Sequence, residues 1–127
     1  MAADSQVTAG QEITAFTQKV HRLDDGRIIG CCGPSISCAK FREFMINGGD
    51  KPDLSDEFRA LILHPSGVVS YIEKDFVELP YRAPAGIGSG SEFAIGAMLA
   101  GASPRKAVEL AIDRDTHSGG EVHSIAL

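Results

Sequence analysis

The chain has 127 residues, 43% of them hydrophobic, and a formal net charge of −5 at pH 7. This length fits a single domain, residues 1–127, that is large enough to bury a core. The acidic balance argues against a nucleic-acid partner, because phosphate binding needs clustered Lys and Arg and the sequence has no such cluster. No apolar run reaches the roughly 20 residues of a membrane-spanning helix, and the N-terminus has no signal-peptide pattern.

The three cysteines, Cys31, Cys32 and Cys38, do not form a disulfide framework, because their number is odd and potential partners are few. They also lack the second Cys or His pair of a zinc site. Cys31 and Cys32 lie inside an apolar stretch, where burial is the ordinary role of cysteine. We therefore expect a cytoplasmic protein with free thiols, no metal and no cofactor.

The first part of the chain predicts strands joined by a tight turn. The opening residues MAADSQVTAG read as a strand already in progress, with Asp4 at a polar turn. Residues 12–23 alternate in polarity as one strand does, with Ile13 and Ala15 on one face. Asp-Asp-Gly at 24–26 is a strong hairpin signal, and the apolar run 27–33 predicts a return strand covered on both faces.

A helix, a second hairpin and a polar connector follow. Residues 34–47 predict a helix with Pro34 in its first turn, ended by Gly48 and Gly49. Its apolar stripe comprises Cys38, Phe41, Phe44 and Met45. After the connector, residues 58–80 predict a hairpin that turns at 65–67, with a third short strand at 76–79.

The last third predicts two helices and a strand. A Gly-rich turn opens a helix of small apolar residues over 93–100, which we expect to be buried on most sides. Ser103 and Pro104 are a typical cap and first position of the next helix, and residues 119–127 alternate as a strand. Grouped antiparallel strands and helices indicate an α+β fold, in which two stacked sheets with helices outside give four αββα layers.

Several motifs, in this order, resemble those of proteasome β-subunits and their bacterial two-ring relatives, which are N-terminal-nucleophile (Ntn) hydrolases. AADSQVTAG resembles the Ala-Asp strand of the family, QKVHRL its lysine strand, and RIIGCCG the strand before its oxyanion glycine. The Gly-Ser-Gly turn into a small-residue helix, the Ser-Pro helix containing AVELA, and RDTHSGG before a last strand are also similar. The resemblance covers nearly the whole chain and implies an αββα sandwich.

The resemblance implies a chemistry in which an N-terminal threonine hydroxyl attacks a peptide carbonyl and its own α-amine accepts the proton. A lysine ammonium tunes that amine, an aspartate pairs with the lysine, and a glycine N–H stabilises the oxyanion. These three roles would fall to Lys19, Asp4 and Gly33. The residues implied around the α-amine are Asp115, Ser118 and Ser89.

In the family, the nucleophile is the first residue of a strand that lies one hairpin before the Ala-Asp stretch. The sequence here starts at Met1 and Ala2, and neither side chain carries a hydroxyl or a thiol. Either a longer protein carries the leading strand, or the chain is an inactive assembly subunit. The retained Asp4, Lys19, Asp115 and Ser118 favour the first explanation. The resemblance then implies a threonine-type endopeptidase acting on peptides or unfolded proteins, as a homo-oligomer such as a ring, with an ATP-dependent unfoldase as partner.

Each site residue also has a simpler interpretation. Lys19 could extend into solvent as strand lysines usually do, and Asp4 could only serve a turn. Gly33 before Pro34 could be a strand-to-helix turn. Ser89 and Ser91 could cap the next helix, while His117 and His123 are typical surface residues. The same catalytic centre would also serve an amidase acting on small molecules.

Overall fold

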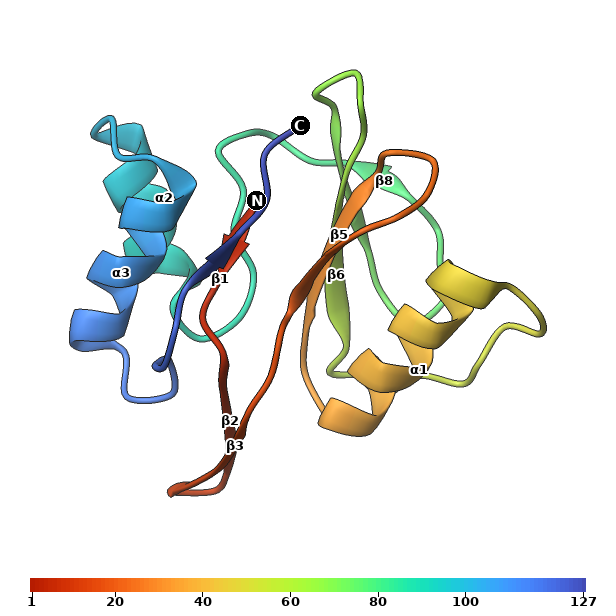
Figure 1. The fold of residues 1–127 in the computed structure, drawn as a ribbon, viewed down its shortest axis with the longest axis horizontal. Coiled ribbons are helices and arrows are strands. Elements are labelled where there is room, and N and C mark those ends of the chain that lie inside the picture. The colour runs from red at the N-terminus through yellow and green to blue at the C-terminus, as the bar shows by residue number, and fades with distance from the viewer.

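The fold has four layers (Figure 1), in a computed structural model that describes residues 1–127. One outer layer contains the helices α2 (Ser91–Leu99) and α3 (Pro104–Arg114), and the other is the helix α1 (Ser35–Asn47). Two layers of antiparallel strands lie between them. The predicted α+β class with αββα layering is therefore confirmed.

A five-stranded antiparallel sheet packs against α1. Its second strand has buried residues on both faces, Ile28 and Ile29, because α1 covers one side and the other strand layer lies on the opposite side. The apolar sequence Ile-Ile-Gly-Cys-Cys reflects this double coverage. In spatial order the strands are β4 (Val20–Arg22), β5 (Ile28–Cys32), β6 (Arg59–Leu63), β7 (Val69–Ile72) and β8 (Leu79–Pro80).

The other strand layer brings the two ends of the chain side by side. β1 (Ala2–Ala3) pairs with β9 (His123–Ser124), and β2 (Gln6–Ala9) pairs with β3 (Glu12–Phe16). The carbonyl oxygen of Gly119 accepts hydrogen bonds from the N–H groups of both Ser5 and Gln6, at 3.1 Å each. These bonds continue the contact between the chain ends past β1. The β2–β3 hairpin projects away from the rest of the layer (Figure 1).

The main core lies between α1 and the five-stranded sheet. Phe41 on α1 and Phe58 before β6 are fully buried, with ring centroids 5.0 Å apart and the rings tilted by 53°. Burial of such rings is a large part of what stabilises a domain of this size. The buried members of this cluster are Leu23, Ile29, Phe41, Leu54, Phe58, Ala60, Ile62 and Ile72.

The predicted strand over residues 12–23 is wrong as a single element. It divides into β3 and β4, which belong to different layers, and only β4 pairs with the return strand β5. Residues 17–19 carry the chain across between the layers. Ile13, on the apolar face predicted for that strand, is 53% exposed because β3 lies in the projecting hairpin. An alternating pattern cannot show that a strand changes partners partway along.

The helix over residues 93–100 was also expected to be buried, and α2 contains no buried residue. Phe93 and Leu99 are 48% and 70% exposed, because α2 packs mainly on α3 and no other element covers these two side chains. The predicted end strands are shorter than expected, since only Leu79–Pro80 and His123–Ser124 pair. Pro34 stands at the N-cap position rather than inside the first turn of α1.

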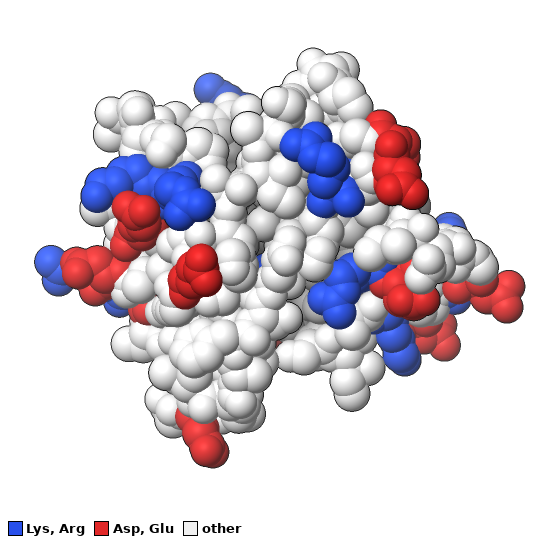
Figure 2. All heavy atoms as spheres, viewed as in Figure 1, with Lys and Arg blue, Asp and Glu red and all other residues white.

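Other local predictions are confirmed. Gly26, in the turn between β4 and β5, has a φ of +88°, which glycine adopts without strain. The side chain of Ser103 accepts a hydrogen bond from the N–H of Lys106 and caps α3. Acidic and basic side chains are interspersed around the outer helices, and the middle of this face is mostly uncharged (Figure 2). None of the helices has the length and apolar character needed to cross a membrane.

Candidate active site

An ion pair joins Asp4 and Lys19 where the chain passes between the strand layers. Asp4 follows β1, and Lys19 comes just before β4. Lys19 Nζ lies 2.7 Å from Asp4 Oδ1 and donates a second hydrogen bond, 2.6 Å long, to the carbonyl oxygen of Gln6. The side chains are only 25% and 13% exposed for Lys19 and Asp4 respectively. Lys19 is therefore held inward by two oxygens, unlike an ordinary strand lysine.

Backbone N–H groups fix the carboxylate of Asp4. Its Oδ2 accepts hydrogen bonds from Gly119 N at 2.9 Å and Gln6 N at 3.3 Å. Hydrogen bonds to a carboxylate are among the stronger ones in proteins. Asp4 thus connects the lysine to the segment that follows α3, far away in the sequence.

A second polar cluster forms around Asp115 at the end of α3. Oδ2 of Asp115 accepts hydrogen bonds from the hydroxyls of Ser89, at 2.6 Å, and Ser118. Burial by itself would raise the pKa of Asp115, but the hydrogen bonds from Ser118, Ser89 and the N–H of His117, together with the charge of His117, lower its pKa below the usual value. The carboxylate therefore stays ionised, and both serine hydroxyls are oriented as its donors.

The two clusters are joined through the backbone at Gly119. Ser118 belongs to the Asp115 cluster, and the next residue, Gly119, donates its N–H to Asp4. A Cβ at Gly119 would collide with Oε1 of Gln6, so a larger residue there would displace the Gln6 side chain. Gln6 and Gly119 were not named from the sequence. The double glycine of RDTHSGG was the only available signal for this close contact.

Gly33 lies between β5 and α1 with a φ of +112°. A Cβ at this position would meet the carbonyl oxygen of Glu57 at 2.8 Å and the Cα of Phe58 at 3.1 Å. Both the backbone conformation and the available space require glycine here. The simple interpretation of Gly33 as a strand-to-helix turn is thus correct, and it is compatible with a further role for its N–H.

One cavity of about 990 Å³ brings the candidate residues together. Asp115 does not line it but contacts it through Ser89 and Ser118, which do. A volume of this size suits a peptide segment or a drug-sized molecule. Polar groups occupy part of the largely apolar cavity wall, and in binding sites such groups fix the orientation of the ligand. The candidates that line the cavity are Asp4, Lys19, Gly33, Ser89 and Ser118.

The simpler role proposed for Ser91 is not observed. Ser91 is the first residue of α2, Gly90 occupies the N-cap position, and no side chain caps this helix. Ser89 bonds to Asp115 rather than to the helix backbone. No group of three or more His, Cys, Asp or Glu side chains is arranged to hold a metal ion.

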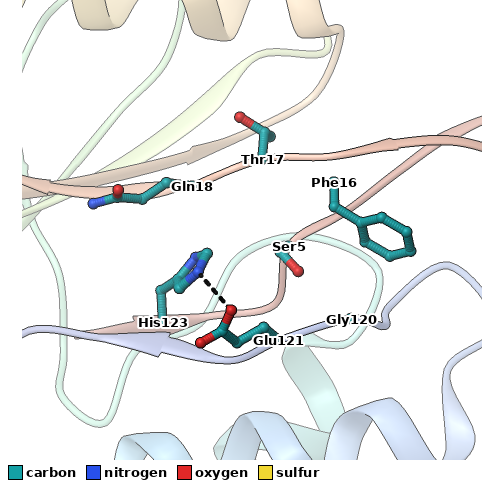
Figure 3. A pocket seen from close by; sticks show the side chains of 7 residues that line it. All are labelled: Ser5, Phe16, Thr17, Gln18, Gly120, Glu121 and His123. Atoms are coloured by element: carbon teal, nitrogen blue, oxygen red, sulfur yellow. Dashed lines mark ion pairs between the residues drawn. The ribbon is translucent and has the colours of Figure 1, made fainter.

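A smaller hollow of about 440 Å³ lies beside Ser5 (Figure 3). Ser5 Oγ and His123 Nδ1 are buried and have no hydrogen-bond partner. His123, expected at the surface, is only partly exposed, and its Nε2 lies 3.7 Å from Glu121 Oε2. This polar hollow was not predicted. Its lining comprises Ser5, Phe16, Thr17, Gln18, Gly120, Glu121 and His123.

Comparison with solved structures identifies proteins of similar fold. Thiobacillus denitrificans BPH in complex with epoxomicin aligns with a TM-score of 0.75 and 18% identity, over 96% of this chain and 88% of that chain. Thiobacillus denitrificans BPH aligns with a TM-score of 0.68 and 19% identity, over the same shares of the two chains. No protein-family model matches the sequence, and no curated protein does. At this identity the likeness concerns the fold, and it is consistent with an Ntn-type fold.

Proposed function

We propose that this chain forms the lysine–aspartate part of a threonine-type, proteasome-like peptidase site. The observation that carries the proposal is the Lys19–Asp4 ion pair, at 2.7 Å and mostly shielded from solvent, on the wall of the large cavity. The structural likeness to a protein that binds epoxomicin, a proteasome inhibitor, supports the same class. The nucleophile would be a threonine on a leading strand of the natural protein, which the sequence printed here does not contain.

The residues present suit such a reaction. The Lys19 ammonium would favour the anionic form of a hydroxyl and the neutral form of an amine placed beside it. Asp4 holds that ammonium in position, since two backbone N–H groups fix its carboxylate. Ser118 and Ser89, oriented by Asp115, would hydrogen-bond the α-amine. The N–H of Gly33 would stabilise the oxyanion that forms when the peptide carbonyl is attacked.

The proposal is tested with the protein in the form isolated from its natural source, treated with a threonine-directed β-lactone. We expect one adduct per chain on a mature N-terminal threonine, detected by intact mass and peptide mapping. Replacing Lys19 by Ala should slow labelling and peptide hydrolysis by about 10²–10⁴-fold, as loss of a proton-handling group typically does. Lys40→Ala, which changes an exposed lysine on α1, is the matched control and should label at the normal rate.

Two results would contradict the proposal. One is native protein that carries no adduct although its circular dichroism shows it to be folded. The other is a Lys19→Ala variant that labels as fast as the Lys40→Ala control. A panel of peptides and small amides, run on the same preparation before it is treated with the β-lactone, separates a peptidase from an amidase that uses the same centre.

A catalytically inactive assembly subunit is the second candidate, and the outer surface of α2 favours it. Phe93 and Leu99 on α2 and Leu110 on α3 are 48%, 70% and 44% exposed. Exposed large apolar residues on neighbouring helices often mark a protein–protein contact. An assembly role predicts a stable complex together with an absence of β-lactone labelling, whereas a peptidase predicts labelling.

A further inference from the structure

The smaller hollow contains two buried polar atoms that the rest of the chain leaves without partners (Figure 3). Ser5 is only 2% exposed, and its Oγ has no hydrogen-bond partner. Nδ1 of His123 is buried and without a partner as well. Buried polar groups in proteins are nearly always hydrogen-bonded. Two exceptions among the residues that line one hollow therefore point to a ligand that supplies the missing partner.

The position of Glu121 indicates which nitrogen of His123 carries the proton. Nε2 of His123 lies 3.7 Å from Oε2 of Glu121. A carboxylate attracts an N–H and repels a lone pair, so in the neutral imidazole the proton belongs on Nε2 and Nδ1 is an acceptor. The distance of 3.7 Å is longer than a hydrogen bond. The carboxylate of Glu121 therefore keeps its capacity to accept hydrogen bonds from a ligand.

The other polar side chains of the hollow also offer oxygen atoms. Gln18 donates its side-chain N–H to the carbonyl oxygen of Val20, at 2.8 Å, which leaves the amide oxygen of Gln18 for a ligand. The hydroxyls of Ser5 and Thr17 can accept as well as donate. No lysine or arginine lines the hollow, and Glu121 adds a negative charge to it. Such a wall suits a cation that carries several donors.

An aromatic ring borders the same hollow. Phe16 is 62% exposed, although its side chain is large and apolar. A Cβ added to Gly120 would lie 2.6 Å from Cδ1 of the Phe16 ring and would also collide with the Ser5 hydroxyl. The ring and the hydroxyl are therefore neighbours at Gly120. The face of an aromatic ring is electrostatically negative and attracts a cation.

We propose that this hollow binds a guanidinium group, which belongs either to a small free molecule or to an arginine side chain of a peptide. A guanidinium has several N–H donors in one plane and no acceptor, and it stacks on aromatic rings. It therefore matches the carboxylate of Glu121, the Nδ1 acceptor of His123 and the ring of Phe16. A lysine ammonium is more strongly hydrated and does not stack in this way.

The size of the hollow and the freedom of its side chains allow this binding. Its volume of about 440 Å³ lies within the range of small-ligand sites. The shielded atoms of Ser5 and His123 reach the ligand when these side chains turn about their χ angles, which requires no movement of the backbone. The exposed groups of Phe16 and Glu121 are accessible without any rotation.

The hollow adjoins the candidate active site but does not share its chemistry. Thr17 and Gln18 line both the hollow and the large cavity. None of the residues to which the proposed peptidase assigns a chemical role lines the hollow. Guanidinium binding is therefore independent of the proposed function, and failure of one proposal leaves the other intact.

The test is isothermal titration calorimetry of the native chain with two probes, n-butylguanidine and the tripeptide acetyl-Ala-Arg-Ala-amide. We expect saturable binding at one site per chain. Tighter binding of the tripeptide assigns the hollow to an arginine side chain, and tighter binding of n-butylguanidine assigns it to a small molecule. The neutral controls are n-butylurea and the tripeptide with citrulline in place of arginine. Each should bind about tenfold or more weakly than its charged counterpart.

Three variants locate the binding. Glu121→Gln removes the charge and keeps the shape, so it should weaken n-butylguanidine binding by about tenfold or more. Glu92→Gln removes the same charge from an exposed position on α2 and is the matched control, which should bind as the wild type does. Ser5→Ala should weaken binding by about threefold or more. The unliganded Ser5→Ala chain should keep its stability, because the hydroxyl has no partner to lose.

Three results would overturn the proposal. One is folded wild-type protein that shows no saturable binding of either charged probe. Another is binding of n-butylurea as tight as that of n-butylguanidine. The third is equal binding of n-butylguanidine by Glu121→Gln and Glu92→Gln, because the charge beside the hollow would then have no part in recognition.

Discussion

Asp4 and Gly119 show how single residues organise the candidate site. The carboxylate of Asp4 accepts from Gly119 N and pairs with Lys19, so one side chain connects three parts of the chain. Hydrogen bonds to a charged group typically contribute about 1.5–3 kcal/mol each to the stability of the folded state. The position of the Lys19 ammonium in the cavity therefore depends on backbone geometry as well as on charge.

Gly33 gives a prediction at the scale of one residue. Gly33→Ala adds a Cβ that would lie 2.8 Å from the carbonyl oxygen of Glu57, at a φ of +112°. We expect the free energy of unfolding to fall by about 2–4 kcal/mol from strain and overpacking together. Chemical denaturation measures this change.

Gly10→Ala is the matched control, because φ at Gly10 is +61° and an added Cβ meets nothing within 4 Å. We expect the free energy of unfolding of this variant to fall by only about 1–2 kcal/mol, which is the cost of the left-handed backbone conformation for a residue with a Cβ. Equal losses in the two variants would show that the close contact with Glu57 does not limit substitution at Gly33.

Asp115 gives a prediction about pH. Burial raises the pKa of Asp115, but the hydrogen bonds from Ser118, Ser89 and the N–H of His117, with the charge of His117, leave it lowered in the folded chain. A lowered pKa stabilises the fold above the unfolded value of 3.8, and this contribution is lost as the pH falls through the folded pKa. Stability should therefore decrease more between about pH 5 and about pH 3 in the wild type than in Ser118→Ala.

Denaturant titrations at the two pH values measure this difference. Ser91→Ala is the control, because Ser91 neighbours the cluster in the sequence but gives Asp115 no side-chain hydrogen bond. It should keep the pH dependence of the wild type. Parallel curves for wild type and Ser118→Ala would mean that Ser118 does not tune the carboxylate.

At the scale of elements, α1 is anchored through one ring. Phe41 is fully buried against Phe58, whereas Ile36 on the same helix is 71% exposed. Phe41→Ala should lower the free energy of unfolding by about 3–5 kcal/mol, because it removes a large buried side chain and leaves a cavity. Ile36→Ala should change it by less than about 0.5 kcal/mol.

Thermal and chemical unfolding of the two variants checks the comparison. Both substitutions leave alanine in the same helix, so any change in helix propensity is similar and the difference reports on burial. A Phe41→Ala variant as stable as Ile36→Ala would place the main core somewhere other than between α1 and the five-stranded sheet.

The sequence predicted those elements whose signals are local. The turn at 24–26 depends on adjacent residues, and so does the Ser103 cap of α3. The crossing at residues 17–19 could not be predicted, because both strands that it joins continue the same alternation. The exposure of α2 was missed for a related reason, since an apolar composition does not reveal how many sides of a helix are covered.

The residues of the candidate site were predicted from the order of motifs along the chain that resemble those of a known family. The spacing of apolar residues in strands and helices did not indicate them. Asp4 and Lys19 were named as a pair, and the structure places them in contact. Ser89, Asp115 and Ser118 were named as a group, and they form one hydrogen-bonded cluster. Their catalytic roles remain predictions. The link through Gly119 was missed, because a backbone hydrogen bond leaves no side-chain signal in a sequence.

At the scale of the whole molecule, the apolar surface of α2 predicts self-association. Leu99 is 70% exposed and Phe93 is 48% exposed, and exposed large apolar side chains of this kind favour contact with another chain. Leu99→Lys should weaken association by about tenfold or more, because burial of one leucine contributes about 1.5–3 kcal/mol. Sedimentation equilibrium measures the association constant.

The control is Val68→Lys, which changes a residue 54% exposed in the turn before β7. It should associate as the wild type does. Wild-type protein that remains monomeric at every concentration would contradict a role for α2 in assembly, and equal weakening by both variants would point to a general effect of added charge.

The pairing of β1 with β9 has a consequence for the order of events during synthesis on the ribosome. Asp4 and Gly119, which bond to each other, are separated by 115 positions in the chain. Asp4 therefore emerges from the ribosome before Gly119 and remains without this partner while the 115 positions between them are translated. The five-stranded sheet and α1 lie within residues 20–80, so they can assemble first, whereas the candidate site is completed last. A stalled or truncated translation product would then contain a nearly complete core and no site.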